Sequence, residues 1–199
     1  MFNSSFDHTL NRLLSKLPDG NIAFVIIGLN SLIYGLWLIW PQNNRYLFMN
    51  HFMFSGHALQ QGYVHSLVTN HFCHTGFITY LIDSVIMYLF CQNLTMLYGP
   101  LYVTKTVILS MFLGSLAMFL QERLTGLPEP QEGNTAILRG LIFLLIFHNP
   151  SATLRLFPIP IDVPGYAIAG LILFLDFFWR YDFSAFGGVG AAYAMVYML

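Results

Sequence analysis

The chain has 199 residues, of which 56% are hydrophobic and 17% aromatic, while only 9% carry a charge. Soluble globular proteins have about 25% charged residues, so this composition, with a mean hydropathy of +0.63, indicates a fold that is solvated by lipid. The net charge of -1 excludes the class of proteins that bind nucleic acid through a basic surface, because no excess of cations is left to neutralise phosphates.

Residues 1–20 lack the charged start, apolar core and small-residue cleavage site of a secretory signal. With Arg12 and Lys16 they are interpreted as a short amphipathic helix on a membrane surface, stopped by the "PDG" turn at 18–20. A weak mitochondrial address is the alternative. We therefore divide the chain into an N-terminal surface segment, 1–20, and a transmembrane domain, 21–199.

Six apolar segments follow in the transmembrane domain, and about 20 such residues are needed for a helix that crosses a membrane. They cover residues 21–40, 76–99, 101–120, 134–149, 165–179 and 187–199. The fourth and the last are too short for a hydrocarbon core of about 30 Å, so we expect them inside a bundle with their ends in water or protein. The predicted fold class is all-α: a polytopic membrane protein with a six-helix bundle.

The segment between the first two spans, residues 41–75, is rich in aromatic residues and histidine and too polar to cross a membrane. Interfacial half-helices fit it best. His71 and His74 have the i, i+3 spacing that metal ligands can have on a helix, but no Asp, Glu or Cys is placed to complete a shell. We predict interfacial histidines and no metal. Cys73 and Cys91 are interpreted as small buried hydrophobic residues.

Three ionisable side chains fall within the spans, namely Asp83, Arg139 and Asp176. Intramembrane charges are costly, face the interior of a bundle and usually pair with each other. One arginine and two carboxylates therefore predict a structural ion pair or triad. A proton or ion path is the alternative, but an arginine that is always charged is a poor relay.

The last span carries small residues at a spacing of four, Gly187 with Ala191 and Gly188 with Ala192. Small residues at this spacing let the backbone of one helix approach a neighbouring helix closely. We predict that these four residues pack against another helix. A nucleotide-binding loop is not indicated, because no strand precedes them.

The order of these features resembles the rhomboid superfamily of intramembrane serine proteases and their inactive relatives. The stretch "GYVHSLVTNHFCHTGFITYLIDSVIMYLF" is similar to the family's entry into its second core helix, and "GNTAILRG" to the Gly-x-Ser-Gly-Ala motif of the nucleophile. "FHNPSATLRLFPIPI" is similar to a proline-bounded loop, and "AFGGVGAAYA" to the motif that carries the base. Within the family, the first span and the segment after it most resemble the presenilin-associated mitochondrial branch.

The resemblance places Thr135 at the position of the nucleophile and Ala185 at that of the histidine base, or Ser184 or Phe183 if the register shifts. Threonine has a hydroxyl, but its added methyl group stiffens χ1 and crowds attack. No histidine follows His148 in the sequence. A hydroxyl without an adjacent base is a weak nucleophile, so the resemblance implies a pseudoprotease.

The family's oxyanion-hole histidine and asparagine correspond to Thr79 and Asp83, and its loop Trp-Arg pair to Val64-His65. A carboxylate at Asp83 would repel the negative charge that an amide donor should stabilise. Matches are found in the scaffold, at His74, Gly76, Gly133, Gly140, Pro150, Pro160, Gly187, Gly188 and Tyr193. We expect no catalytic residue; Thr135, Ala185, Thr79 and Asp83 are vestigial positions.

The helical spacing of four residues places Thr135 and Arg139 on one helix face, which the resemblance turns toward Asp83. We therefore predict that Arg139 pairs with Asp83 or, failing that, with Asp176, within about 6 Å.

The expected function is structural. The chain is predicted to be an accessory subunit of a large complex in the mitochondrial inner membrane, such as a respiratory complex or ATP synthase. The expected partners are other integral subunits and membrane lipids, including cardiolipin; no cofactor or nucleic acid is expected. One alternative is a client-binding pseudorhomboid, of the derlin or inactive-rhomboid kind, that recognises transmembrane helices. The remote alternative is residual proteolysis through Thr135.

Overall fold

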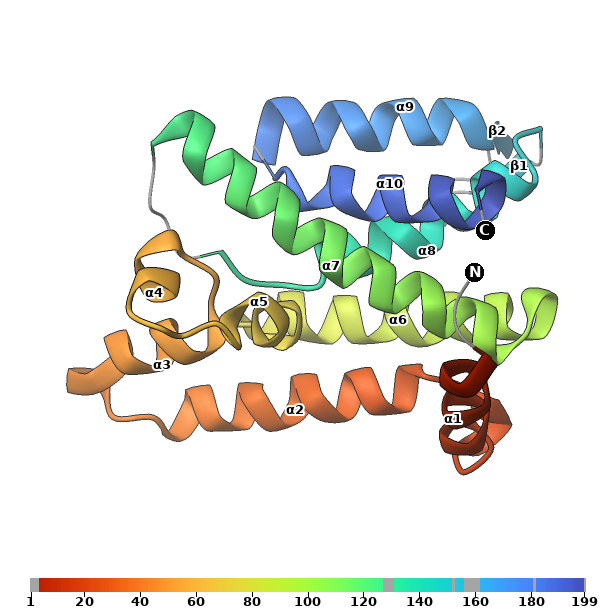
Figure 1. The fold of residues 1–199 in the computed structure, drawn as a ribbon. Helices are drawn as coiled ribbons and strands as arrows, with labels where there is room; N and C mark the ends of the chain where they lie inside the picture. Colours follow the sequence, from red (N-terminus) through yellow and green to blue (C-terminus); the bar gives the residue numbers. More distant parts are fainter. Residues whose placement is uncertain (1–3, 127–130, 152, 156–161, 181, 199) are drawn as a thin grey trace.

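The computed structural model describes residues 4–126, 131–151, 153–155, 162–180 and 182–198. The described chain is a bundle of helices with one short strand pair at its edge (Figure 1). The prediction of an all-α fold is confirmed. Pro160, one of the prolines on which the family resemblance rests, lies outside the described residues.

The N-terminal segment forms helix α1, Ser4–Leu14, followed by a 3-10 turn, Pro18–Gly20. Helix α1 is tied to the bundle because Lys105 donates to Asp7 with a shortest N···O distance of 2.7 Å. The side chain of Leu14 is buried against the rest of the fold. The surface helix therefore docks on the transmembrane domain at one end.

Helix α2, Ala23–Ile39, ends at Trp40, whose extended backbone is the one that a following proline favours. The chain then turns by 112° into a segment of short helices. These are a 3-10 turn Gln42–Asn44, α3 Arg45–Phe52, α4 Gly56–Gln60, α5 Ser66–Thr69 and a 3-10 turn Asn70–Phe72. The short helices expected in this segment are present, and their position at a membrane interface stays a prediction.

Helices α6, Phe77–Tyr98, and α7, Pro100–Thr125, are the longest of the fold. Proline at the first position of α7 fits a helix start, and Gly126 in the left-handed conformation ends it. Helix α7 runs five residues beyond the predicted end at residue 120, so residues 121–125, which are polar except for Leu124, are helical too. The apolar pattern alone could not find this polar extension.

The C-terminal part contains α8, Thr135–His148, the strands β1, Thr153–Arg155, and β2, Asp162–Pro164, and then α9, Gly165–Leu175. The strands pair antiparallel, with Thr153 opposite Pro164. A π-helical turn, Asp176–Arg180, continues α9, and helix α10, Ser184–Tyr197, follows. The last helix starts three residues before the predicted Gly187.

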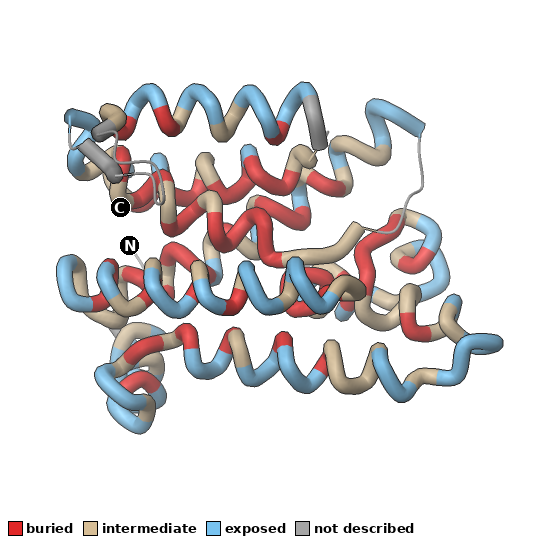
Figure 2. The backbone as a smooth tube through the Cα atoms, turned by 180° about the vertical axis from the view of Figure 1, so that it is seen from behind, coloured by how far each residue is buried: buried red, intermediate tan, exposed pale blue. Residues whose placement is uncertain are grey.

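Helix α8 lies at the centre, in contact with α6, α7, α9 and α10. Helices α2 and α9 lie at opposite edges of the bundle (Figure 1). Buried residues gather along α8 and α10, while α2 and α9 expose much of their length (Figure 2). The core therefore surrounds the short helices, and longer helices cover them.

Among the described residues, α6 and α7 are long and apolar enough to cross a membrane. Helix α2 with the segment to Phe52 would make a third span if the bent pair is counted as one. Helices α8 and α10 have 14 residues each, about 21 Å, so they are short for a core of about 30 Å. Helix α8 is packed among α6, α7, α9 and α10, as a short helix at membrane depth requires, whereas α10 packs on α7 and α8 and exposes Phe186, Tyr193 and Tyr197 on its other side.

Candidate functional site

Three helix starts meet at one end of the bundle, those of α6, α8 and α10 (Figure 1). Thr79, Thr135 and Ala185, which the family resemblance matches to catalytic positions, each lie in the first turn of one of these helices. A cavity of about 410 Å³ lies between the first turns of α6 and α8. Its lining residues are His74, Thr79, Asp83, Ile86, Glu132, Gly133, Thr135, Leu138, Arg139 and Ile142.

Thr135 occupies the first position of α8, and 8% of its surface is exposed. The preceding Gly133 has a φ of +107°, a conformation that glycine adopts without strain, and its N–H donates to the carbonyl of Asn70 at 3.0 Å. Within the described chain the Thr135 hydroxyl makes no hydrogen bond. It therefore borders the cavity without a hydrogen bond to the histidine or the carboxylates that line it.

His74 and Asp83 form a pair across the start of α6, with 3.2 Å between Nε2 and Oδ2. The imidazole is almost fully buried, and the carboxylate is 29% exposed. The first-choice prediction that Asp83 pairs with Arg139 is wrong. The reason is tertiary: the turn before α6 brings His74 onto the carboxylate, which spacing along one helix cannot reveal.

Arg139 pairs with Asp176, the second choice of the prediction, which is confirmed. Nε lies 2.6 Å from Oδ2 and Nη2 lies 2.8 Å from Oδ1, so the contact has two parallel hydrogen bonds. The Asp176 side chain is 1% exposed and that of Arg139 17%. This bidentate ion pair joins the second turn of α8 to the end of α9, and the charge of Arg139 neutralises the buried carboxylate of Asp176.

Thr79 and Ala185 offer no catalytic donor or base in this arrangement. The Thr79 hydroxyl donates to the carbonyl of Gly76 at 2.9 Å, one turn back in its own helix. Ala185 is fully buried. If the register shifts by one, Ser184 takes the base position, but its hydroxyl donates to Asp182.

The small residues of α10 pack as predicted. A Cβ built on Gly188 would overlap the carbonyl oxygen of Ala136 in α8, and one on Gly187 would overlap the backbone of α7 at Leu113. Ala191 and Ala192 are fully buried. The prediction of close helix packing at these four positions is confirmed.

Glu132 is a site residue that the sequence did not single out. Its carboxylate accepts from the backbone N–H of Thr75 at 3.1 Å and from the Thr75 hydroxyl at 2.5 Å. Cys73 donates its S–H to the same carboxylate at 3.5 Å. Burial, and then this negative charge, raise the pKa of the Cys73 thiol above its usual value, so the thiol stays protonated. The sequence feature that could have indicated this role is the acidic side chain directly before Gly133.

His71 and His74 serve different contacts. His71 is fully buried, and its Nε2 lies 2.9 Å from the carbonyl of Met111 and 2.9 Å from the Ser115 hydroxyl, both in α7. Burial lowers the pKa of His71 to about 4, so the ring is neutral and its N–H donates to the carbonyl. No group of three or more His, Cys, Asp or Glu among the described residues could hold a metal ion.

Comparison with known proteins gives two matches. Residues 61–199 match the profile of the Rhomboid domain. A curated relative, "RHOMBOID-like protein 12, mitochondrial" from Arabidopsis thaliana, is 24% identical over 175 residues, which cover 79% of this chain and 51% of that protein. The chain thus spans about half the length of the curated relative it matches.

Proposed function

This chain belongs to the rhomboid family, and from that premise we propose that it is a catalytically inactive member. We propose that it acts as a structural accessory subunit of a large complex in the mitochondrial inner membrane, a respiratory complex or ATP synthase. One observation carries the proposal: the hydroxyl of Thr135 borders the cavity without a hydrogen bond to any described residue, while Ala185 takes the position of the base.

The loss of the base is the strongest support for inactivity. In hydrolases with a nucleophile–base pair, removing the base alone removes most of the catalysis. His74 is the imidazole on the cavity, and it contacts Asp83 and not Thr135. The carboxylates of Asp83 and Glu132 also line the cavity, and they oppose the negative charge that develops on a tetrahedral intermediate.

The role as a scaffold is supported by how the polar groups of the site are used. Arg139 holds α8 to α9, and Glu132 holds the start of α8 to the turn before α6. These contacts join helices, which is what a subunit of fixed shape needs. The mitochondrial location is part of the proposal and is supported by the curated relative, which is a mitochondrial rhomboid-like protein. The narrower placement in the presenilin-associated branch rests on the resemblance of the first span and the segment after it.

Affinity purification from native membranes in mild detergent tests the accessory role. A tag on this chain is expected to recover a fixed, stoichiometric set of integral membrane proteins that migrates as one large complex on a native gel. Recovery of a free monomer, with no stable complex that contains the chain, would overturn it.

The second candidate is a client-binding pseudorhomboid of the derlin or inactive-rhomboid kind. The observation in its favour is that the cavity of about 410 Å³ remains beside the start of α6. Photo-crosslinking from Thr79, which is exposed at the rim of this cavity, separates the two candidates. Many transient single-span clients would favour the second candidate, and a constant set of neighbours would favour the first.

A further inference from the structure

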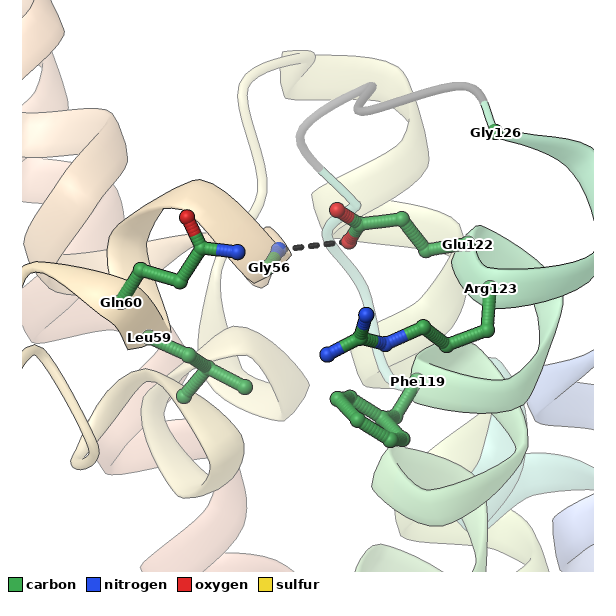
Figure 3. Close-up of a pocket in the computed structure, with 7 residues that line it drawn as sticks. All are labelled: Gly56, Leu59, Gln60, Phe119, Glu122, Arg123 and Gly126. Atoms are coloured by element: carbon green, nitrogen blue, oxygen red, sulfur yellow. Dashed lines mark hydrogen bonds between the residues drawn. The ribbon is translucent and has the colours of Figure 1, made fainter.

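A second depression lies away from the candidate site, between helix α7 and the short helices α4 and α5. It is an apolar groove of about 680 Å³. It shares Leu59 and Phe119 with a more polar pocket of about 410 Å³ at the end of α7 (Figure 3). The two form one continuous depression, apolar along α7 and polar at the end of the helix. None of its residues lines the cavity beside Thr135.

The floor of the groove is a stripe of apolar residues on α7. Ile108, Phe112 and Leu116 follow at intervals of four and so share one helix face. The opposite wall includes Val64 and Val68, which are 60% and 53% exposed. Two exposed apolar surfaces therefore face a common space, and at membrane depth an apolar occupant packs against such surfaces by van der Waals contact.

The groove runs along α7 and opens into the polar pocket at one end. From Ile108 to Phe119 the helix rises about 16 Å, close to half of a hydrocarbon core of about 30 Å. One leaflet of a membrane has this depth, and a lipid in it presents an apolar chain at one end and a polar headgroup at the other. The groove has the same order of surfaces, apolar along the residues of α7 and polar at Arg123.

The polar end of the groove presents one cation. The guanidinium of Arg123 lies over the ring of Phe119, 5.0 Å from its centre, and Arg123 makes no ion pair within the described part of the chain. The neighbouring Glu122 is turned to helix α4, where it accepts the N–H of Gly56 at 2.5 Å (Figure 3). The guanidinium of Arg123 therefore has N–H donors that face the pocket and make no ion pair among the described residues. The carboxylate of Glu122, in contrast, is already hydrogen-bonded to α4.

We propose that this groove binds one glycerophospholipid, with the phosphate on Arg123 and one acyl chain along α7 from Phe119 to Ile108. Guanidinium and phosphate match in charge and in hydrogen-bond geometry. Arg123 follows the apolar part of α7, which places it where a membrane has its headgroups. Because Glu122 adjoins the single cation, the site takes one phosphate, so the two phosphates of cardiolipin bring no advantage. This proposal concerns the isolated chain and is independent of the accessory role.

Native mass spectrometry of the purified chain, titrated with phosphatidylglycerol in detergent, tests the site. We expect one saturable lipid adduct. Arg123→Gln should weaken it about tenfold or more, since hydrogen bonds to charged groups contribute that much. Arg12→Gln, which removes an exposed arginine of α1, should leave it unchanged. Diacylglycerol, which lacks the phosphate, should bind about tenfold more weakly, inorganic phosphate should give no saturable adduct, and cardiolipin should bind within about threefold of phosphatidylglycerol.

The acyl part of the site has its own pair of variants. Leu116→Trp fills the groove and should remove the adduct, whereas Leu120→Trp, on the same helix outside the groove, should keep it. The proposal is overturned if the adduct is absent from the wild-type chain, or if Arg123→Gln and Leu116→Trp both leave it unchanged. It is also overturned if a photo-crosslinker at Leu116 captures a protein helix in native membranes in place of a lipid.

Discussion

Two faces of helix α8 differ in how they are filled. One face, with Ala136 and Gly140, meets α7 and α10 so closely that a single added carbon would overlap the backbone or side chains across it. The other, with Thr135 and Arg139, borders a cavity of about 410 Å³. Close packing holds the first face, and paired polar groups hold the second. The comparison teaches that polar side chains near a candidate active site can be structural, so the role of each must be inferred from the group that it contacts.

The largest effect is expected at the Arg139–Asp176 pair, on the cavity face. Arg139→Ala leaves a buried carboxylate unpaired and should lower the free energy of unfolding by about 3–5 kcal/mol. The double variant Arg139→Leu/Asp176→Leu should lose less, because no unpaired charge remains. Equilibrium unfolding in detergent micelles measures both.

Two controls sharpen this first prediction. Lys105→Ala breaks the pair with Asp7, whose carboxylate is 29% exposed and stays partly hydrated, so it should cost less than Arg139→Ala. Asp83→Asn should also cost far less than Arg139→Ala, since Asp83 is not the partner of Arg139. If Lys105→Ala is as destabilising as Arg139→Ala, the Arg139–Asp176 ion pair is not the main contact that stabilises the cavity face of α8.

The next effect belongs to the packed side and depends on pH. His71, buried against α7, has a pKa of about 4 in the folded chain, below the ordinary 6.5. Between these values the unfolded chain binds more protons, so the free energy of unfolding falls as the pH is lowered from 6.5 to 4. One such group contributes about 1.4 kcal/mol per pH unit, about 3 kcal/mol in total.

The variant that checks this titration is His71→Gln, which keeps a donor but does not titrate in this range. Between pH 4 and 6.5 the free energy of unfolding of His71→Gln should change less with pH than that of the wild-type chain. The difference between the two slopes is the contribution of His71. Parallel profiles for the two proteins would show that His71 is not buried in its neutral form.

A smaller effect is expected at the α8–α10 contact. Gly188→Ala places a methyl group against the carbonyl of Ala136 and should destabilise by about 1–3 kcal/mol. Gly35→Ala in α2, where nothing lies within 4 Å of the added carbon, should instead stabilise by up to about 1 kcal/mol. Thermal unfolding followed by tryptophan fluorescence compares the two. Equal shifts would mean that α8 and α10 are not in backbone contact.

The smallest effect is expected for Thr135→Ala. The Thr135 hydroxyl makes no hydrogen bond within the described residues, so its removal, with the methyl group, should change the free energy of unfolding by less than about 1 kcal/mol. A loss as large as that of Arg139→Ala, measured in the same unfolding experiment, would reveal a structural role that the contacts do not explain.

Much of the fold could be predicted from the sequence, because apolar runs and their proline and glycine boundaries locate helices. The six helices and the close packing of Gly187 and Gly188 were found in this way. The strand pair and the polar end of α7 were not, because neither has an apolar signal. The partner of Arg139 also could not be chosen by spacing, since the contact of His74 with Asp83 depends on the turn between them.

Glu132 and Arg139, which bind α8 to neighbouring segments, also have partners that the sequence alone could not predict. Glu132 reaches Thr75, which lies far away in the sequence, and Arg139 reaches the end of α9. Which distant partner a charge meets is decided by helix packing. The proposed loss of the base, in contrast, rests on the sequence alone, because Ala185 stands at the matching position and no histidine follows His148 in the sequence given.

The central proposal is that the cavity beside Thr135 does not catalyse peptide-bond cleavage. A cleavage assay tests it most directly. The purified chain is reconstituted in liposomes with a single-span transmembrane substrate, and product is measured for the wild-type chain and for Thr135→Ala. The account predicts that both proteins yield no more product than liposomes with substrate alone. Any cleavage that the wild-type chain performs and Thr135→Ala does not would contradict it.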